Sequence, residues 1–101
     1  MKYGLNVWFE LTRTRRDMLL AVAQLDAEDE TPTGADVATR VQTIRCGDRP
    51  ATDTVYSGLD RLRHLGLVAR EKVNERTHAY HMTDTGWGIL DAVRDEFPVR
   101  D

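Results

Sequence analysis

The chain is short and slightly acidic: it has 101 residues, with 14 Lys and Arg against 17 Asp and Glu, and a formal net charge of -3 at pH 7. This length predicts one domain, without a separate ligand-binding domain. No stretch approaches the ~20 apolar residues of a membrane helix, and the N-terminus lacks a signal-peptide core. The single cysteine, Cys46, excludes an internal disulfide and suits a reducing interior, so we expect a cytoplasmic protein.

Two amphipathic helices are predicted in the first half of the chain, over residues 12–26 and 33–44. Thr12 or Thr14 is the expected N-cap of the first helix, and Thr33 is that of the second. Both apolar stripes follow the helical period. They consist of Met18, Leu19, Val22 and Leu25 in the first helix and of Val37, Ala38, Val41 and Ile44 in the second. A broken apolar run precedes these helices over residues 5–11, and no secondary structure is predicted there.

A third helix is predicted over residues 51–65, where Val55, Leu59 and Leu62 share one buried stripe. At about 100° per residue, the opposite side carries short polar residues and becomes basic toward its C-terminal half. This face consists of Asp53, Ser57, Arg61 and His64, flanked by Thr54 and Tyr56. Such a face suits a helix laid in the major groove of DNA, although most polar helix faces are simply solvated.

A β-hairpin over residues 67–83 and a last helix over residues 84–97 complete the chain. In the second arm of the hairpin, Tyr80 and Met82 share a face and should pack on the helices. Thr83 is the expected N-cap of the last helix. The apolar stripe of that helix consists of Trp87, Leu90, Val93 and Phe97, widened by Ile89. The predicted fold class is therefore α+β and mainly helical, with a three-helix core, a hairpin and a C-terminal helix.

Seven short motifs, taken in order and spacing, carry a family resemblance. They are Phe9-Glu10-Leu11-Thr12, Arg16-Asp17-Met18-Leu19, Val55-Tyr56-Ser57-Gly58-Leu59-Asp60-Arg61-Leu62, Leu65-Gly66-Leu67-Val68, Arg76-Thr77, Ala79-Tyr80-His81-Met82-Thr83 and Thr85-Gly86. Over roughly residues 9 to 97 the chain resembles the PadR-like winged helix transcriptional regulators, and more narrowly the compact haloarchaeal versions that include phage repressors. Ser57 stands where the family often has proline, and Thr54 where it has a long polar residue, so the operator sequence stays open.

The resemblance implies double-stranded DNA as the partner, with the helix 51–65 in the major groove and the hairpin as a wing on the minor groove or backbone. Ten residues are expected to contact DNA: Thr52, Thr54, Tyr56, Ser57 and Arg61 on this recognition helix, Arg49 before it, Asn74, Arg76 and Thr77 on the wing, and Arg40 on the second helix. Arg61 could pair with guanine or contact phosphate. Further candidates for backbone contacts are Arg13, Arg15 and Arg16. Asp53 and Asp60 would repel phosphate, so they are expected to pair with arginines or to cap the helix.

A twofold homodimer is the expected assembly, because a broad apolar stripe lies at the end of the chain. Packing of the last helix on its own core explains part of the same pattern. The expected interface residues are Trp8, Trp87, Leu90, Val93 and Phe97. A dimer of this kind sets two recognition helices about 34–36 Å apart and predicts a palindromic operator.

Arginine dominates the basic residues, since only Lys2 and Lys72 are lysines. In concentrated salt, direct contacts outweigh long-range attraction, and the planar guanidinium makes the better contact. A GC-rich genome gives the same bias. Together with the resemblance, this composition predicts a halophilic archaeon or its virus as the source.

No catalytic site, metal or cofactor is expected. His78 and His81 point to opposite faces of a strand, and Cys46 lacks a neighbouring ligand. The predicted function is a dimeric repressor associated with the nucleoid. The alternatives are a winged helix protein-interaction module without DNA affinity and a regulator that responds to a small-molecule effector of unknown identity.

Overall fold

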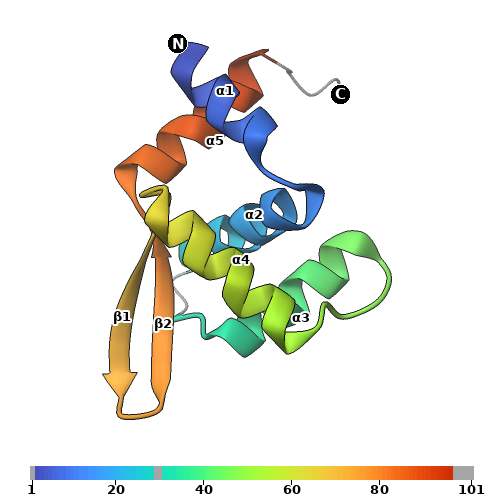
Figure 1. Ribbon diagram of the computed structural model, residues 1–101, viewed down its shortest axis with the longest axis vertical. Helices are drawn as coiled ribbons and strands as arrows, with labels where there is room; N and C mark the ends of the chain where they lie inside the picture. Colours follow the sequence, from blue (N-terminus) through green and yellow to red (C-terminus); the bar gives the residue numbers. More distant parts are fainter. Residues whose placement is uncertain (1, 29–30, 97–101) are drawn as a thin grey trace.

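The computed structural model describes residues 2–28 and 31–96, and over these residues the chain forms five helices and one hairpin (Figure 1). The helices are α1 (Lys2–Glu10), α2 (Arg13–Ala27), α3 (Gly34–Arg45), α4 (Thr52–His64) and α5 (Asp84–Glu96), and the hairpin pairs β1 (Val68–Asn74) with β2 (Thr77–Met82). The four predicted helices and the hairpin begin and end within one residue of their expected bounds. None of the helices described is long and apolar enough to span a membrane.

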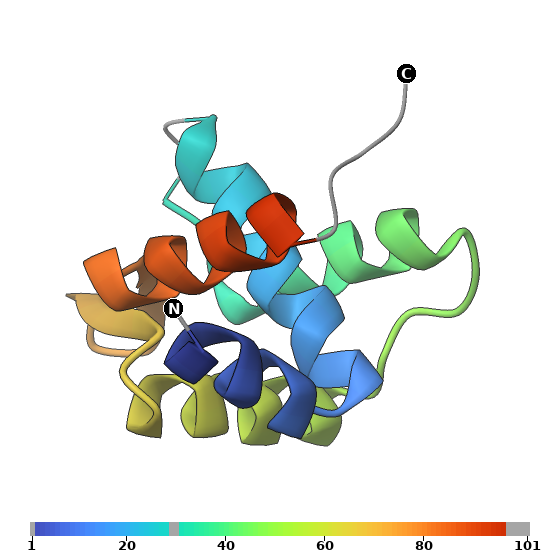
Figure 2. The same cartoon turned by 90° about the horizontal axis from the view of Figure 1, so that it is seen from above.

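α1 is the one described helix that was not predicted from the sequence. It packs along α5, with Val7 and Trp8 half-buried against the core (Figure 2). Arg16 of α2 binds its free C-terminal carbonyls: Nε donates to the Trp8 oxygen at 2.9 Å, and Nη2 donates to the Phe9 oxygen at 3.1 Å. The same guanidinium lies 5.3 Å from the centroid of the Trp8 ring. α1 therefore depends on α2 and α5, which an interrupted apolar pattern does not reveal.

The helices begin at the N-caps expected from the sequence. Thr12, rather than Thr14, caps α2 by accepting a hydrogen bond from a first-turn amide at 3.2 Å. Thr33 and Asp36 form a reciprocal capping box at the start of α3, with distances of 3.0 and 3.3 Å. The Thr83 hydroxyl accepts from the first turn of α5 at 3.0 Å. These caps fix the entry of the chain into three of the five helices.

The predicted apolar stripes meet in one core. Those of α2 and α4 are buried throughout, and that of α3 is buried except for Ile44, which is half-buried at the edge. Tyr80 and Met82 of β2 are also buried, as predicted. Ala79 is buried as well, which interrupts the alternation of buried and exposed side chains along β2. It forms an antiparallel bridge with Thr33, the residue before α3.

Two backbone amides of β2 donate hydrogen bonds to the helical part of the molecule. The Tyr80 amide donates to the Pro32 carbonyl at 2.9 Å. The Met82 amide donates to the carboxylate of Asp26, at the end of α2, at 3.0 Å. The base of the hairpin is therefore fixed relative to α2 and α3.

β1 is the outer strand of the hairpin. Every residue after Val68 is exposed, and the antiparallel register shifts between Lys72 and Asn74. Such a bulge increases the local twist. The Asn74 side-chain oxygen accepts from the Arg76 amide at 3.0 Å and closes the turn.

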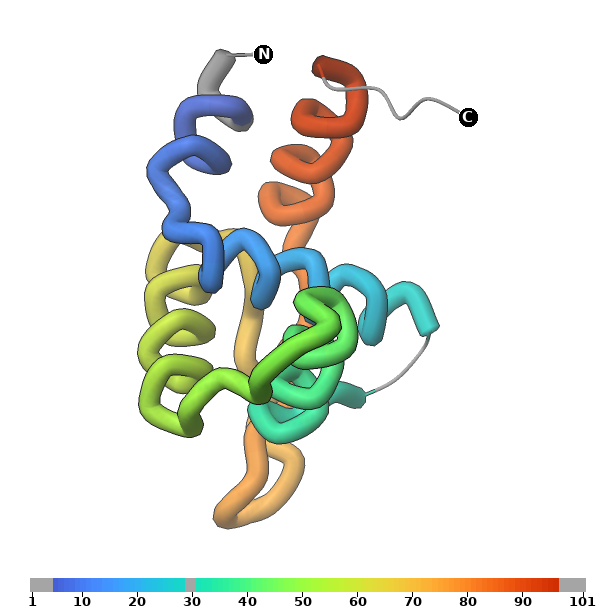
Figure 3. Tube along the Cα trace, turned by 90° about the vertical axis from the view of Figure 1, so that its right-hand side faces the viewer, coloured from blue at the N-terminus to red at the C-terminus, as the bar shows by residue number. Residues whose placement is uncertain are grey.

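The molecule is elongated, with extents of 40 × 28 × 25 Å. α1 and α5 lie side by side at one end, and the tip of the hairpin is at the other (Figure 3). α4 lies between these ends, in contact with α2 and α3, and one of its sides faces the solvent.

Two glycines of α5 give a matched test of this packing. A Cβ at Gly86 would collide with the Leu67 carbonyl oxygen, whereas a Cβ at Gly88 would meet open space. We expect Gly86→Ala to lower the free energy of unfolding by about 1–3 kcal/mol through overpacking. Gly88→Ala should raise it by up to about 1 kcal/mol, because alanine is the better helix former. Urea unfolding monitored by circular dichroism measures both, and equal effects of the two substitutions would contradict the placement of α5.

Candidate nucleic-acid interface

α4 packs closely on α2 and exposes its polar side. A Cβ at Gly58 would lie 2.5 Å from the Met18 sulfur, so the helices could not approach as closely with a larger residue at this position. Val55, Leu59 and Leu62 are buried on the same side. The exposed side carries the residues expected there: Asp53, Ser57, Arg61 and His64.

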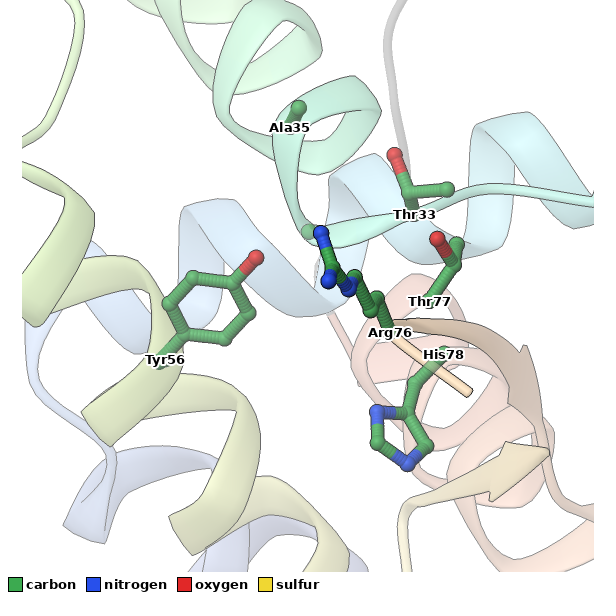
Figure 4. Close-up of a pocket in the computed structure, with 7 residues that line it drawn as sticks. Thr33, Ala35, Tyr56, Arg76, Thr77 and His78 are labelled. Carbon is green, nitrogen blue, oxygen red and sulfur yellow. The ribbon is translucent and has the colours of Figure 1, made fainter. Parts of the chain in front are cut away.

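The flank of α4 that carries Tyr56 borders a cleft of about 370 Å³, which we call the wing-side cleft. Its lining residues are Thr33, Gly34 and Ala35 at the start of α3, Tyr56 of α4, and Arg76, Thr77 and His78 of the hairpin. Figure 4 shows the Tyr56 ring and the Arg76 guanidinium reaching toward each other from opposite sides. Gly34 makes room for this ring, because a Cβ there would lie 2.7 Å from the ring atom Cε1 of Tyr56.

The opposite flank of α4 borders a second cleft of about 430 Å³, which we call the α2-side cleft. The start of α2 and the first half of α4 line it, with Thr12, Thr14 and Arg15 facing Asp53, Thr54, Ser57 and Gly58. Tyr56 and Thr54 are two residues apart, about 200° around the helix, which places the two clefts on different flanks. A polar cleft therefore lies on each side of the exposed face of α4.

Arg49 connects the segment before α4 to α3. Its Nη1 donates to the Thr39 hydroxyl at 2.5 Å, and its Nη2 donates to the Ala35 carbonyl at 3.2 Å. Arg49 and Thr52 line a smaller cavity between α3 and α4 together with Tyr56. Both expected phosphate contacts thus lie beside the start of α4, and Arg49 also binds the segment before α4 to α3.

The cationic side chains fall into two groups. One group is bound within the fold, as in Arg45, which donates to the Asp17 carboxylate at 2.9 Å and to the Thr14 hydroxyl at 2.7 Å. The other group has no hydrogen-bond or ion-pair partner among residues 5–28 and 31–96, and it consists of Arg13, Arg15, Arg61, Lys72 and Arg76. These free cations lie at the start of α2, on α4 and on the hairpin, which are the elements around the two clefts.

Two arginines considered for DNA contacts are bound elsewhere. Arg40 donates to both carboxylate oxygens of Glu28, at 2.9 and 3.0 Å, and to Gln24 at 3.1 Å. Its hydrogen bond holds the pKa of Glu28 below the ordinary value. Arg16 binds the end of α1, as described above. The guanidinium groups of Arg40 and Arg16, like that of Arg49, thus have internal acceptors, and a contact of these side chains with DNA stays a prediction.

The two aspartates of α4 differ from each other. Asp60 accepts from Arg63 at 2.7 Å, and this hydrogen bond lowers the pKa of Asp60, so the expected pairing is confirmed. Asp53 has no hydrogen-bond or ion-pair partner in the described part of the chain. It does not cap α4 either, since Ala51 occupies the N-cap position and no side chain binds there. An unpaired carboxylate therefore stands on the exposed face.

The wing residues depart in part from the expected arrangement. The Asn74 oxygen is used in the turn, and Arg76 reaches back into the wing-side cleft instead of outward from the tip (Figure 4). His78 was not among the predicted contacts, although it lines the same cleft as Arg76. The contribution of Gly34 and Ala35 was also missed, because it depends on how α3 packs against α4. No group of three or more His, Cys, Asp or Glu among the described residues could hold a metal ion.

The expected dimer residues lie on α1 and α5, at the end opposite the wing tip. Trp8, Leu90 and Val93 are half-buried against the core of their own chain. Trp87 is 37% exposed, and Phe9, which was not in the expected set, is 55% exposed. Phe97 lies outside the described residues. Three of the predicted interface residues thus pack within their own chain. The rings of Trp87 and Phe9 leave an exposed apolar surface.

Solved structures of transcription regulators share this fold. RosR of H. salinarum superposes with a TM-score of 0.67 at 20% identity over 91% of this chain and 82% of that chain. MepR, a transcription regulator of the Staphylococcus aureus multidrug efflux pump MepA, gives 0.66 at 21% identity over 89% and 60%. A MarR-family transcription regulator gives 0.67 at 19% identity over 86% and 52%. No family model and no curated protein matches the sequence. The predicted winged helix architecture, mainly helical with a β-hairpin, is confirmed.

The division of the arginines into bound and free groups can be tested by stability. Arg49→Ala removes two hydrogen bonds to α3, so we expect the free energy of unfolding to fall by about 0.5–1.5 kcal/mol for each bond. We also expect faster amide exchange over residues 46–52. Arg61→Ala removes no internal partner and should change the free energy of unfolding by less than about 0.5 kcal/mol. Urea unfolding and hydrogen exchange of both variants check this. A large stability loss in Arg61→Ala would show that Arg61 belongs to the bound group.

Proposed function

We propose that this chain is a sequence-specific, double-stranded-DNA-binding transcription regulator that acts as a dimeric repressor at a palindromic operator. α4 enters the major groove, and the hairpin contacts the minor groove or the neighbouring backbone. The observation that carries the proposal is the group of unpaired cations around the exposed face of α4. The sequence resemblance to compact PadR-like regulators and the likeness to H. salinarum RosR support a halophilic archaeon or its virus as the source.

The distribution of charge explains how a chain with a net charge of -3 can bind a polyanion. Acidic residues on the last turns of α5 lie at the end away from the wing tip. The carboxylates of Asp17 and Glu28 are neutralised by Arg45 and Arg40. The free arginines remain beside α4, so the field attracts DNA to this side and repels it from the other.

The two clefts fit the two sugar-phosphate backbones that border a major groove. In the wing-side cleft, the Arg76 guanidinium, the Tyr56 hydroxyl and the first-turn amides of α3 supply donors for a phosphate. In the α2-side cleft, Arg15 and Thr14 supply donors of the same kind. The exposed side of α4 lies between them and carries Thr54, Ser57 and Arg61 toward the base edges.

A dimer increases both affinity and specificity. A single module of this kind buries only about 600–1,000 Å² of protein surface on DNA, and two linked modules double the contact. The rings of Trp87 on α5 and Phe9 on α1 supply exposed apolar surface. These two helices lie at the end of the molecule away from the wing tip (Figure 3). An isologous contact there leaves both α4 helices free to face one side of a duplex. By occupying a promoter, such a dimer excludes the polymerase.

DNA binding is tested by selecting operator sequences from randomised duplexes and then footprinting the selected site. Arg61→Ala should weaken binding and relax the preference at one base pair in each half-site, by about 1–3 kcal/mol. Arg76→Ala should weaken binding to all sequences alike and reduce the slope of log K against log salt by about 1. Arg94→Ala is the matched control, because Arg94 lies on α5. If Arg61→Ala and Arg76→Ala both bind as the wild type does, this face is not the DNA interface.

The assembly is tested by introducing a charge at its expected centre. Trp87→Glu places a carboxylate on the apolar surface of α5, which a dimer interface would have to bury at a large cost. We expect the variant to sediment as a monomer while its circular dichroism spectrum stays unchanged, since Trp87 is partly exposed. Its footprint should lose the twofold pattern. A Trp87→Glu protein that remains dimeric would place the interface elsewhere.

A further inference from the structure

The unpaired carboxylate of Asp53 stands where DNA would lie if the proposed function holds. Asp53 is exposed in the first turn of α4 and lines the α2-side cleft with Thr54 and Ser57. The other aspartate of this helix is neutralised by Arg63. No cation of the described chain is bonded to Asp53, although the free Arg15 lines the same cleft.

A carboxylate at this place discriminates between base edges. It only accepts hydrogen bonds at neutral pH, and it repels phosphate. In the major groove, guanine and thymine present acceptors at their O6 and O4 positions, and the N6 donor of adenine stands beside its N7 acceptor, whereas cytosine presents the amino donor N4 alone. An ionised Asp53 therefore penalises most sequences and is compensated where a cytosine amino group faces it.

Arg61 adds a hydrogen-bond donor to the exposed side of α4 on which Asp53 is an acceptor. Asp53 and Arg61 are eight residues apart on one exposed side of α4, which corresponds to about 12 Å along the helix. At 3.4 Å per base pair, this spans about three or four steps of the duplex. Arg61 is a donor group that suits the O6 and N7 atoms of guanine. The face thus carries an acceptor at one end and a donor at the other.

We propose that Asp53 is a specificity-determining residue, which selects cytosine in each half-site at three or four base pairs from a guanine contacted by Arg61. The assignment rests on the proposed function. The same residue lowers affinity for unrelated DNA, since its charge is compensated only at the matching site.

The experiment measures binding of the full-length protein to all single-base variants of its selected operator. Asp53→Asn should change the preference at one position per half-site from cytosine to adenine, by about five- to tenfold, because asparagine pairs with adenine N6 and N7. Asp53→Ala should lose the preference there. Asp84→Asn is the matched control: Asp84 is likewise exposed in the first turn of a helix, but on α5. Its base preferences should equal those of the wild type.

Three results would overturn the assignment. In the first, Asp53→Asn keeps the wild-type preference at every position while its melting temperature falls as that of Asp84→Asn does, which would make Asp53 only a partner of the helix dipole. In the second, the affinity of Asp53→Asn rises equally for all sequences, which would make the role of Asp53 purely electrostatic. A wild-type protein that binds no duplex at all would refute the proposed function together with the assignment, whereas the first two results leave the proposed function standing.

Discussion

The close packing of α4 on α2 determines which side of α4 is exposed. Gly58 allows this approach because it offers no side chain toward Met18, and the buried side chains of Val55 before it and of Leu59 and Leu62 after it anchor the helix. Once this side is buried, the period of the helix dictates that Asp53, Ser57 and Arg61 face the solvent. The α2-side cleft follows from the same contact, since α2 borders it, whereas the start of α3 and the hairpin border the wing-side cleft.

Arginine has two different tasks in this chain. Arg16, Arg40 and Arg45 donate to carbonyl and carboxylate oxygens and join consecutive helices. Arg61 and Arg76 have the same chemistry but no internal acceptor in the part of the chain that the structure describes. In a core of this size, a few such internal ties supplement a modest burial of apolar surface. The unpaired guanidinium groups keep their donors for an external acceptor.

Local features were predictable from the sequence, and features that depend on tertiary contacts were not. The stripes of α2 and α4 and the caps at Thr12 and Thr33 follow from spacing and residue type alone. α1 escaped prediction because its carbonyls are bound by Arg16, which lies in the next helix. The role of Arg40 depends on Glu28, twelve residues earlier, and the direction of Arg76 depends on the turn. Such partners are set by how the helices pack, which no local pattern encodes.

The outer position of β1 has a consequence for colloidal behaviour. A strand with an unpaired edge is a template on which another chain can add a strand, and this is a common beginning of aggregation. Here the edge carries Arg70, Glu71 and Lys72 in succession, and the bulge before Asn74 twists its far end. A second strand could not add without burying these charges and following the twist. The charges of the wing therefore also protect the folded monomer from edge-to-edge association.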